Sequence, residues 1–153
     1  MPSLEHKTPP PVVGLLLAAG MWGVSGFGPQ LSIAAVPKYS VVALLAVGGV
    51  AFDLLGLLAF RASRTTLNPL KPERATALVT RGIYRVSRNP MYVGMAFLLL
   101  AWAVHLCALL PFVGPVVFVL YITRYQIQPE ERILNGIFGD SYLAYAARTR
   151  RWL

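Results

Sequence analysis

The chain has few of the groups with which soluble proteins build disulfides, metal sites and charged surfaces. It contains one cysteine, two histidines and six acidic residues. A single cysteine excludes an intrachain disulfide and a multi-cysteine metal site, and we expect no metal centre. Charged residues make up 13% of the chain, whereas soluble domains carry about 25%. This composition excludes an ordinary soluble domain.

Apolar residues dominate instead, at 56% of 153 residues. The length suits one domain and leaves no room for a second soluble module of useful size. We therefore predict an all-α integral membrane protein, with a single membrane domain over residues 1–153.

Two apolar segments lie in the first part of the chain. The first begins near Val12 and is interrupted by "GFGP" at 26–29, where we expect a kinked or irregular helix. It extends toward Ala35 if the chain remains helical past that interruption. The second covers about 39–60 and contains one charged residue, Asp53. A carboxylate inside a membrane either serves function or pairs with a neighbouring helix, and the sequence leaves both roles open.

Two more apolar segments share residues 91–123, which contain no Lys, Arg, Asp or Glu. The string "PFVGP" at 111–115 interrupts this run, and two prolines with a glycine favour a tight turn. A helix needs about 20 residues to cross roughly 30 Å of hydrocarbon, so the last segment must continue into "ITRYQIQ" at 122–128. The sequence thus predicts about four transmembrane helices, the last two forming a hairpin.

Basic side chains gather in two clusters that follow apolar segments and account for most of the net charge of +8. The first cluster is Arg61, Arg64, Lys71, Arg74, Arg81, Arg85 and Arg88, and the second is Arg124, Arg132, Arg148, Arg150 and Arg151. This distribution is typical of cytoplasmic loops rather than of nucleic-acid-binding surfaces, so no nucleic-acid partner is expected. We expect a bacterial cytoplasmic membrane, with both termini and any site for a soluble cosubstrate facing the cytoplasm.

The C-terminal tail has its own pattern. Apolar pairs four residues apart occupy 133–138, and Gly-Asp at 139–140 predicts a helix stop and restart. Residues 150–152 suit an anchor at the membrane interface. An anchor does not explain Glu130 and Glu131, because the adjacent leaflet repels anions. The acidic pair indicates a partner with donors or positive charge.

Two strings on either side of the predicted hairpin carry a family resemblance. "GIYRVSRNPMYVG" at 82–94 and "EERILNGIFGDSYLAYAAR" at 130–148 resemble the paired signature of the isoprenylcysteine carboxyl methyltransferase family, which is related to phospholipid N-methyltransferases. The resemblance covers about 65–150. The matching positions are Gly82, Tyr84, Arg88, Pro90, Tyr92, Gly94, Glu130, Glu131, Phe138, Gly139, Tyr142, Tyr145 and Arg148. Asn89 departs from the histidine of the eukaryotic carboxyl methyltransferases, which leaves the methyl acceptor open.

The resemblance implies S-adenosylmethionine as the methyl donor, bound at the cytoplasmic ends of the last two membrane helices. The carboxylates can accept hydrogen bonds from ribose hydroxyls or the ammonium group of this donor. Free amides at a helix start after Pro90 could bind its carboxylate. The candidate cofactor-binding residues are Tyr84, Asn89, Pro90, Tyr92, Gly94, Glu130, Glu131, Tyr142 and Tyr145.

The acceptor implied by the resemblance is a lipophilic molecule that enters from the bilayer, with its carboxylate on a prenylated cysteine or a similar group. A carboxylate is already a nucleophile, so it needs placement and desolvation rather than a base. Arg124 is the first candidate to orient it, followed by Arg88 and Arg148. An amine acceptor, as in phosphatidylethanolamine methylation, would require a base such as Glu131 or a tyrosine pair. A non-catalytic membrane adaptor that retains the fold is the third possibility.

Overall fold

The computed structural model describes residues 8–62 and 77–153, and the secondary structure of these residues is helical apart from one isolated bridge between Gln30 and Ala108. The predicted all-α class is confirmed. Part of the first basic cluster, Arg64, Lys71 and Arg74, lies outside the described residues. In chain order the elements are α1 (Pro10–Val24), α2 (Ala35–Ala62), η2 (Gly82–Arg85), α3 (Pro90–Leu106), η3 (Leu110–Phe112), α4 (Val113–Ile122), η4 (Thr123–Ile127), α5 (Gln128–Phe138) and α6 (Asp140–Arg148).

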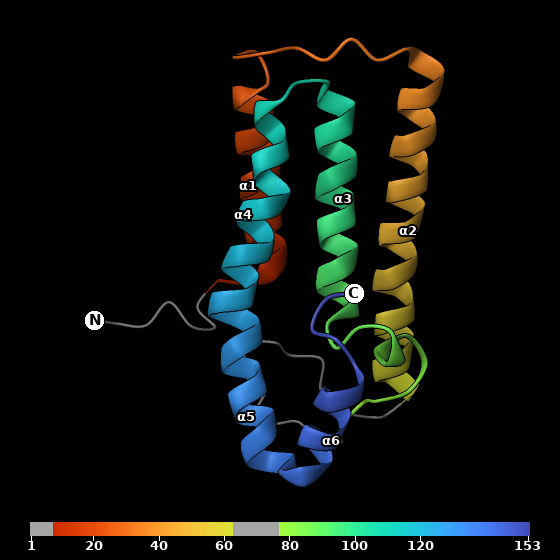
Figure 1. Cartoon of the computed structure of the whole chain (residues 1–153), viewed down its shortest axis with the longest axis vertical. Helices are drawn as coiled ribbons and strands as arrows, with labels where there is room; N and C mark the ends of the chain where they lie inside the picture. Colours follow the sequence, from red (N-terminus) through yellow and green to blue (C-terminus); the bar gives the residue numbers. More distant parts are fainter. Residues whose placement is uncertain (1–7, 63–76) are drawn as a thin grey trace, which may run out of the picture.

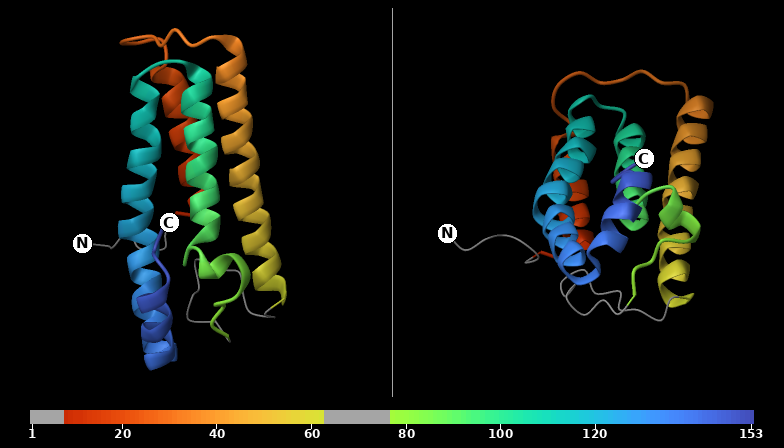
Figure 2. Two further views of the ribbon diagram at one scale, coloured as in Figure 1. Left: turned by 45° about the vertical axis from the view of Figure 1, so that its right-hand side comes forward. Right: turned by 60° about the horizontal axis from the view of Figure 1, so that its bottom comes forward.

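Helices α1, α2, α3 and α4 stand side by side, and α5 and α6 lie at one end of them (Figure 1). Helix α3 packs against both α2 and α4, and α1 packs against α3 and α4. From the underside, α6 lies between α5 and the segment that carries η2 (Figure 2). This arrangement brings the 82–94 motif and the C-terminal tail to the same end of the molecule.

Glycines allow α2 and α3 to approach closely. A Cβ at Gly49 of α2 would lie 2.9 Å from the Gly94 carbonyl oxygen of α3. A Cβ at Gly94 would overlap the Asp53 carboxylate and the Gly49 carbonyl. The glycine of the motif is therefore required for helix packing, and Asp53 lies against the first turns of α3.

The turn between α3 and α4 lies earlier than predicted. Helix α3 ends at Leu106, Cys107 takes a left-handed conformation (φ 51°), and Pro111 already lies in η3. Pro115 falls in the first turn of α4, where a proline removes no helical hydrogen bond. The predicted break at 111–115 is wrong because the prolines begin the helix. Hydrogen bonds from the first loop, Leu31 N to Cys107 O at 2.7 Å among them, fix the earlier turn.

The boundaries of the first two helices also differ from those predicted. Helix α1 ends at Val24, and the chain does not continue as a helix toward Ala35, where α2 begins instead. The Ser25 hydroxyl donates to the Trp22 carbonyl in the last turn of α1, and Gly28 has a positive φ of 75°. The interruption at 26–29 is thus a helix end rather than a kink.

Within residues 8–62 and 77–153, two helical stretches are long and apolar enough to cross a membrane, Ala35–Ala62 and Leu110–Phe138, while α1 and α3 are shorter apolar helices. The second stretch passes without a break from α4 through the π-helical turn η4 into α5. Its apolar part ends before α5, because the first turn of α5 holds Glu130 and Glu131. Outward faces of α1 and α2 expose large apolar side chains, including Leu15, Leu16, Val36, Leu44 and Val47, as expected of surfaces that face lipid.

The predicted stop and restart in the tail is confirmed. Helix α5 ends at Phe138, Gly139 takes a positive φ of 49°, and α6 begins at Asp140. The sharp turn lets α6 fold back toward η2. As a result Tyr142 and Tyr145 form a buried cluster with Tyr84 and Val79.

Candidate functional site

The second glutamate of the acidic pair is the centre of an ion-pair network. Arg88 Nη2 lies 2.9 Å from Glu131 Oε1. Arg151 donates to the same carboxylate in a bidentate manner, from Nε to Oε1 at 3.0 Å and from Nη2 to Oε2 at 2.6 Å. The Arg88 and Glu131 side chains are only 14% and 19% exposed. Arg88 Nε is buried and has no hydrogen-bond partner among residues 8–62 and 77–153.

The first glutamate has a different environment. Glu130 accepts a hydrogen bond from the hydroxyl of Tyr92, at the start of α3. Burial and, to a lesser extent, the neighbouring Glu131 charge together raise the pKa of Glu130 to about 7, against the opposing effect of the Tyr92 hydrogen bond. Glu130 therefore exchanges a proton near neutral pH, whereas its neighbour is held by two arginines.

The chain beyond α6 pairs with the loop that precedes α3. The Arg151 carbonyl accepts hydrogen bonds from Asn89 Nδ2 at 2.9 Å and from Ser87 Oγ at 3.3 Å. Ser87 Oγ also accepts from Asn89 N at 3.1 Å, and Arg88 N donates to Arg150 O at 2.9 Å. The Asn89 side chain thus holds the C-terminal segment, and Pro90 follows it as the first residue of α3.

Three tyrosines from η2 and α6 form the wall beside this network. Tyr145 donates from its hydroxyl to the Tyr84 carbonyl at 2.7 Å, and the Phe60 ring of α2 packs edge-on against Tyr84 at 5.3 Å. Burial raises the pKa of each phenol, and burial together with the Glu131 charge raises that of Tyr142 to about 12. All three stay protonated at neutral pH and can only donate or accept neutral hydrogen bonds there.

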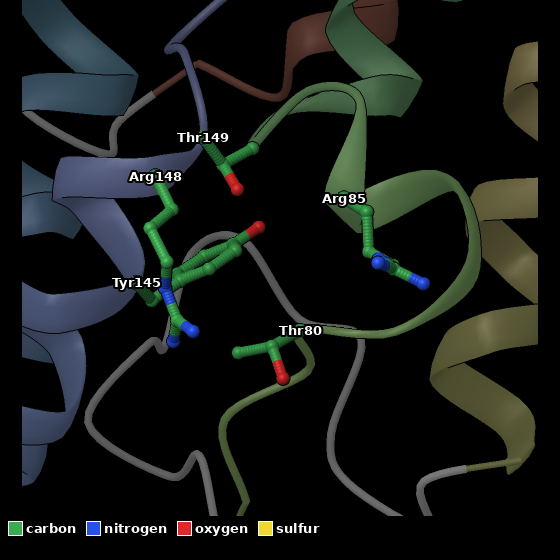
Figure 3. Close-up of a pocket in the computed structure, with 5 residues that line it drawn as sticks. All are labelled: Thr80, Arg85, Tyr145, Arg148 and Thr149. Atoms are coloured by element: carbon green, nitrogen blue, oxygen red, sulfur yellow. The ribbon is translucent and has the colours of Figure 1, made fainter.

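A cavity of about 310 Å³ opens beside the tyrosine wall (Figure 3). Its lining residues are Thr80, Arg85, Tyr145, Arg148 and Thr149. Figure 3 shows the two arginines on opposite sides, with the Tyr145 and Thr149 hydroxyls between them. Arg148 also donates from Nε to the Ala144 carbonyl at 3.1 Å. No carboxylate is among these lining residues, so the cavity suits an anionic group.

The three candidate arginines occupy different places. Arg88 joins the acidic pair, Arg148 lines the cavity, and Arg124 lies exposed in η4 with its guanidinium 5.7 Å from the centre of the Tyr125 ring. The buried Gly94 packs against α2, as described above. The structure therefore groups most of the candidate residues at one end of the bundle but divides them between the acidic pair and the cavity.

Sequence reasoning missed the contribution of the last residues. The sequence predicts an interfacial anchor at Arg151 and Trp152, yet Arg151 binds Glu131 and the Trp152 indole donates to Thr123 Oγ1 at 3.1 Å. Thr123 begins the π-helical turn, a local irregularity that is frequent at functional sites. The string "RTRRWL" carries no signal that separates these contacts from those of a basic anchor.

Comparison with known proteins identifies the family. The family model described as phospholipid methyltransferase matches residues 37–141, which include the whole first motif and the second motif as far as Ser141. A 63-residue stretch is 41% identical to an uncharacterized protein of Haemophilus influenzae, which it covers completely, and makes up 41% of this chain. No solved structure matches the chain significantly.

Two plant enzymes are also similar. Protein-S-isoprenylcysteine O-methyltransferase A of Arabidopsis thaliana is 37% identical over 84 residues, which are 55% of this chain and 43% of that protein. Its counterpart B is 33% identical over 86 residues, which are 56% of this chain and 44% of that protein. The chain thus spans less than half the length of these two relatives.

Proposed function

Because the chain belongs to the phospholipid methyltransferase family, we propose that this membrane methyltransferase uses S-adenosylmethionine to methylate the carboxylate of an isoprenylcysteine-like lipophilic acceptor. The observation that carries the proposal is the Glu130–Glu131 pair, which Tyr92 and Arg88 of the other motif hold at one end of the bundle. Methyl donors of this class are cations, and carboxylates are the side chains that recognise cations.

We propose that α1 to α4 all cross the membrane, α3 and α4 as a hairpin, and that both termini and the site face the cytoplasm. Apolar side chains exposed along α1 and α2 support this arrangement. The basic residues Arg85, Arg88, Arg148 and Arg151 belong to the same end of the bundle, in agreement with the excess of positive charge on cytoplasmic loops.

The described residues fit the donor. Arg88 Nε, buried and without a partner in the described part of the chain, suits the carboxylate of the donor's amino-acid end. Glu130 would accept from the ammonium group or a ribose hydroxyl, and the amides that follow Pro90 add donors at a helix start. Tyr84 and Tyr142 supply buried aromatic walls. S-adenosylmethionine, when bound, supplies an electrophilic methyl group on a sulfonium.

The cavity supports a carboxylate as the acceptor. Arg148, together with the Thr149 hydroxyl, would hold one carboxylate oxygen and leave the other free to attack. No base is required, because the carboxylate is ionised at neutral pH and gains reactivity as water is excluded. Arg124 at the end of α4 remains the alternative anchor. The two Arabidopsis relatives are named as protein-S-isoprenylcysteine O-methyltransferases, which supports transfer to an oxygen.

The second candidate function is N-methylation of a phospholipid such as phosphatidylethanolamine, which the description of the matching family favours. An amine must lose a proton before it attacks. Glu131 is held by two arginines and the tyrosines have raised pKa values, so Glu130, with a pKa of about 7, is the best-suited base. A non-catalytic adaptor is the third reading and predicts no methyl transfer at all.

One experiment separates these functions. Detergent-purified protein is incubated with S-adenosylmethionine labelled in its methyl group, once with a farnesylcysteine analogue and once with phosphatidylethanolamine vesicles. Volatile label released by base indicates a methyl ester and supports the carboxyl reaction. Base-stable label in the lipid fraction would replace it with N-methylation, and no transfer to either acceptor would favour the adaptor.

A further inference from the structure

We propose that Arg151 is a positioning residue of the donor site, which sets the orientation of the Glu131 carboxylate and thereby the affinity for the donor. This inference rests on the proposed function. The residue comes from the C-terminal segment, outside both motifs and outside residues 37–141 that match the family.

The contacts of Arg151 join two parts of the site that are distant in sequence. Its guanidinium holds both oxygens of Glu131 in α5, at 3.0 and 2.6 Å. Its carbonyl accepts from Asn89 and Ser87, just before α3. One residue therefore connects the acidic pair to the first motif through its side chain and its backbone at once.

The next residue secures this segment to the turn between α4 and α5. The Trp152 indole donates to Thr123 Oγ1 at 3.1 Å, in the π-helical turn between α4 and α5. Trp152 also packs against the main apolar core of the bundle. An interfacial anchor would need none of these contacts, because its charge would be satisfied by water and lipid headgroups.

The effect on the donor follows from competition for one carboxylate. A bidentate pair with Arg151 fixes the plane of the Glu131 carboxylate, and Arg88 contacts this carboxylate from Nη2. Arg88 Nε then remains buried and unpaired, as found for the described residues. Without Arg151, the Glu131 carboxylate is free to rotate and to accept from both Nε and Nη2 of Arg88. The donor's carboxylate would lose its partner.

The test compares Arg151→Gln with Arg150→Gln. The control removes the same charge from the adjacent position, where the side chain is exposed and only the backbone carbonyl makes a contact described above. Affinity for S-adenosylhomocysteine is measured by calorimetry, and kcat and KM for the donor are measured with a saturating acceptor. We expect Arg151→Gln to weaken binding and raise the donor KM by about tenfold or more, as for a charged hydrogen-bonded pair, with kcat changed by less than about threefold. Arg150→Gln should stay within about twofold of the wild type.

A conservative variant keeps the test decisive if Arg151→Gln does not fold. Arg151→Lys retains the charge but cannot form the bidentate pair, and an intermediate loss of donor affinity is expected. Wild-type affinity in Arg151→Lys or Arg151→Gln would overturn the inference, as would an equal loss in Arg150→Gln or a loss confined to kcat. If the wild-type protein itself binds no S-adenosylhomocysteine, the proposed function fails, and this inference fails with it.

Discussion

Replacing Glu130 with glutamine should increase the stability of the fold at alkaline pH while it impairs the site. The carboxyl group holds its proton up to about pH 7 in the folded protein, against an ordinary pKa of 4.5, because burial and Glu131 disfavour its charge. Folding therefore takes up a proton between these two values. The contribution of Glu130 to the free energy of unfolding is therefore greatest below pH 4.5, and it is lost as the pH rises through about 7.

The magnitude follows from the same shift. A pKa raised from 4.5 to about 7 corresponds to roughly 3 kcal/mol of lost stability once the carboxylate is ionised. Glutamine keeps an acceptor for the Tyr92 hydroxyl and has no charge to desolvate. The Glu130→Gln variant should therefore unfold several degrees higher than the wild type at pH 8. The two proteins should differ much less at pH 5.

Thermal unfolding in detergent at the two pH values is the assay, and Glu131→Gln is the matched control. The control weakens two ion pairs, so its melting temperature should fall at both pH values. Binding of S-adenosylhomocysteine should weaken in the wild type below about pH 7 and lose this pH dependence in Glu130→Gln. If the melting temperature of Glu130→Gln at pH 8 is at or below that of the wild type, the argument that folding disfavours the ionised form of Glu130 is refuted.

Three further predictions concern the surroundings of the site. Arg148→Gln should raise the acceptor KM by about tenfold while the affinity for S-adenosylhomocysteine stays unchanged, and equal losses for both ligands would contradict its place in the acceptor cavity. Tyr145→Phe removes the hydrogen bond to the η2 backbone and should cost about 1 kcal/mol in thermal unfolding; an unchanged melting temperature would show that this bond is not needed. Gly94→Ala should cost about 1–3 kcal/mol through its overlap with Asp53, whereas Gly20→Ala, which meets open space, should be tolerated; similar effects of both changes would argue against the close helix contact.

Local chemistry explains what could be predicted from the sequence. The long uncharged runs predict helices, because a helix satisfies its backbone hydrogen bonds within the segment. The glycine at 139 predicts a helix end, which its positive φ confirms. The two motifs indicated the family because they combine unusual residue types in a fixed order, and the match over 37–141 confirms it. The role of each residue in them stays a prediction.

Long-range contacts explain what could not be predicted. The turn after α3 lies at Cys107 because the first loop hydrogen-bonds to it from residues 29–31, which no local pattern reveals. In the same way, nothing in the C-terminal string indicates that Arg151 reaches back twenty residues to Glu131. A segment of basic and aromatic residues near a membrane has the same composition whether it anchors the chain or completes a site.

In the proposed function, the two motifs together form one binding site for the methyl donor. A calorimetric titration with S-adenosylhomocysteine tests this central claim most directly. The wild-type protein in detergent should bind one equivalent saturably and should unfold at a higher temperature when the ligand is present. Glu131→Ala should weaken that binding by about tenfold or more, because it releases the Arg88 and Arg151 guanidinium groups together. No heat and no thermal shift with the wild type at millimolar ligand would contradict the account.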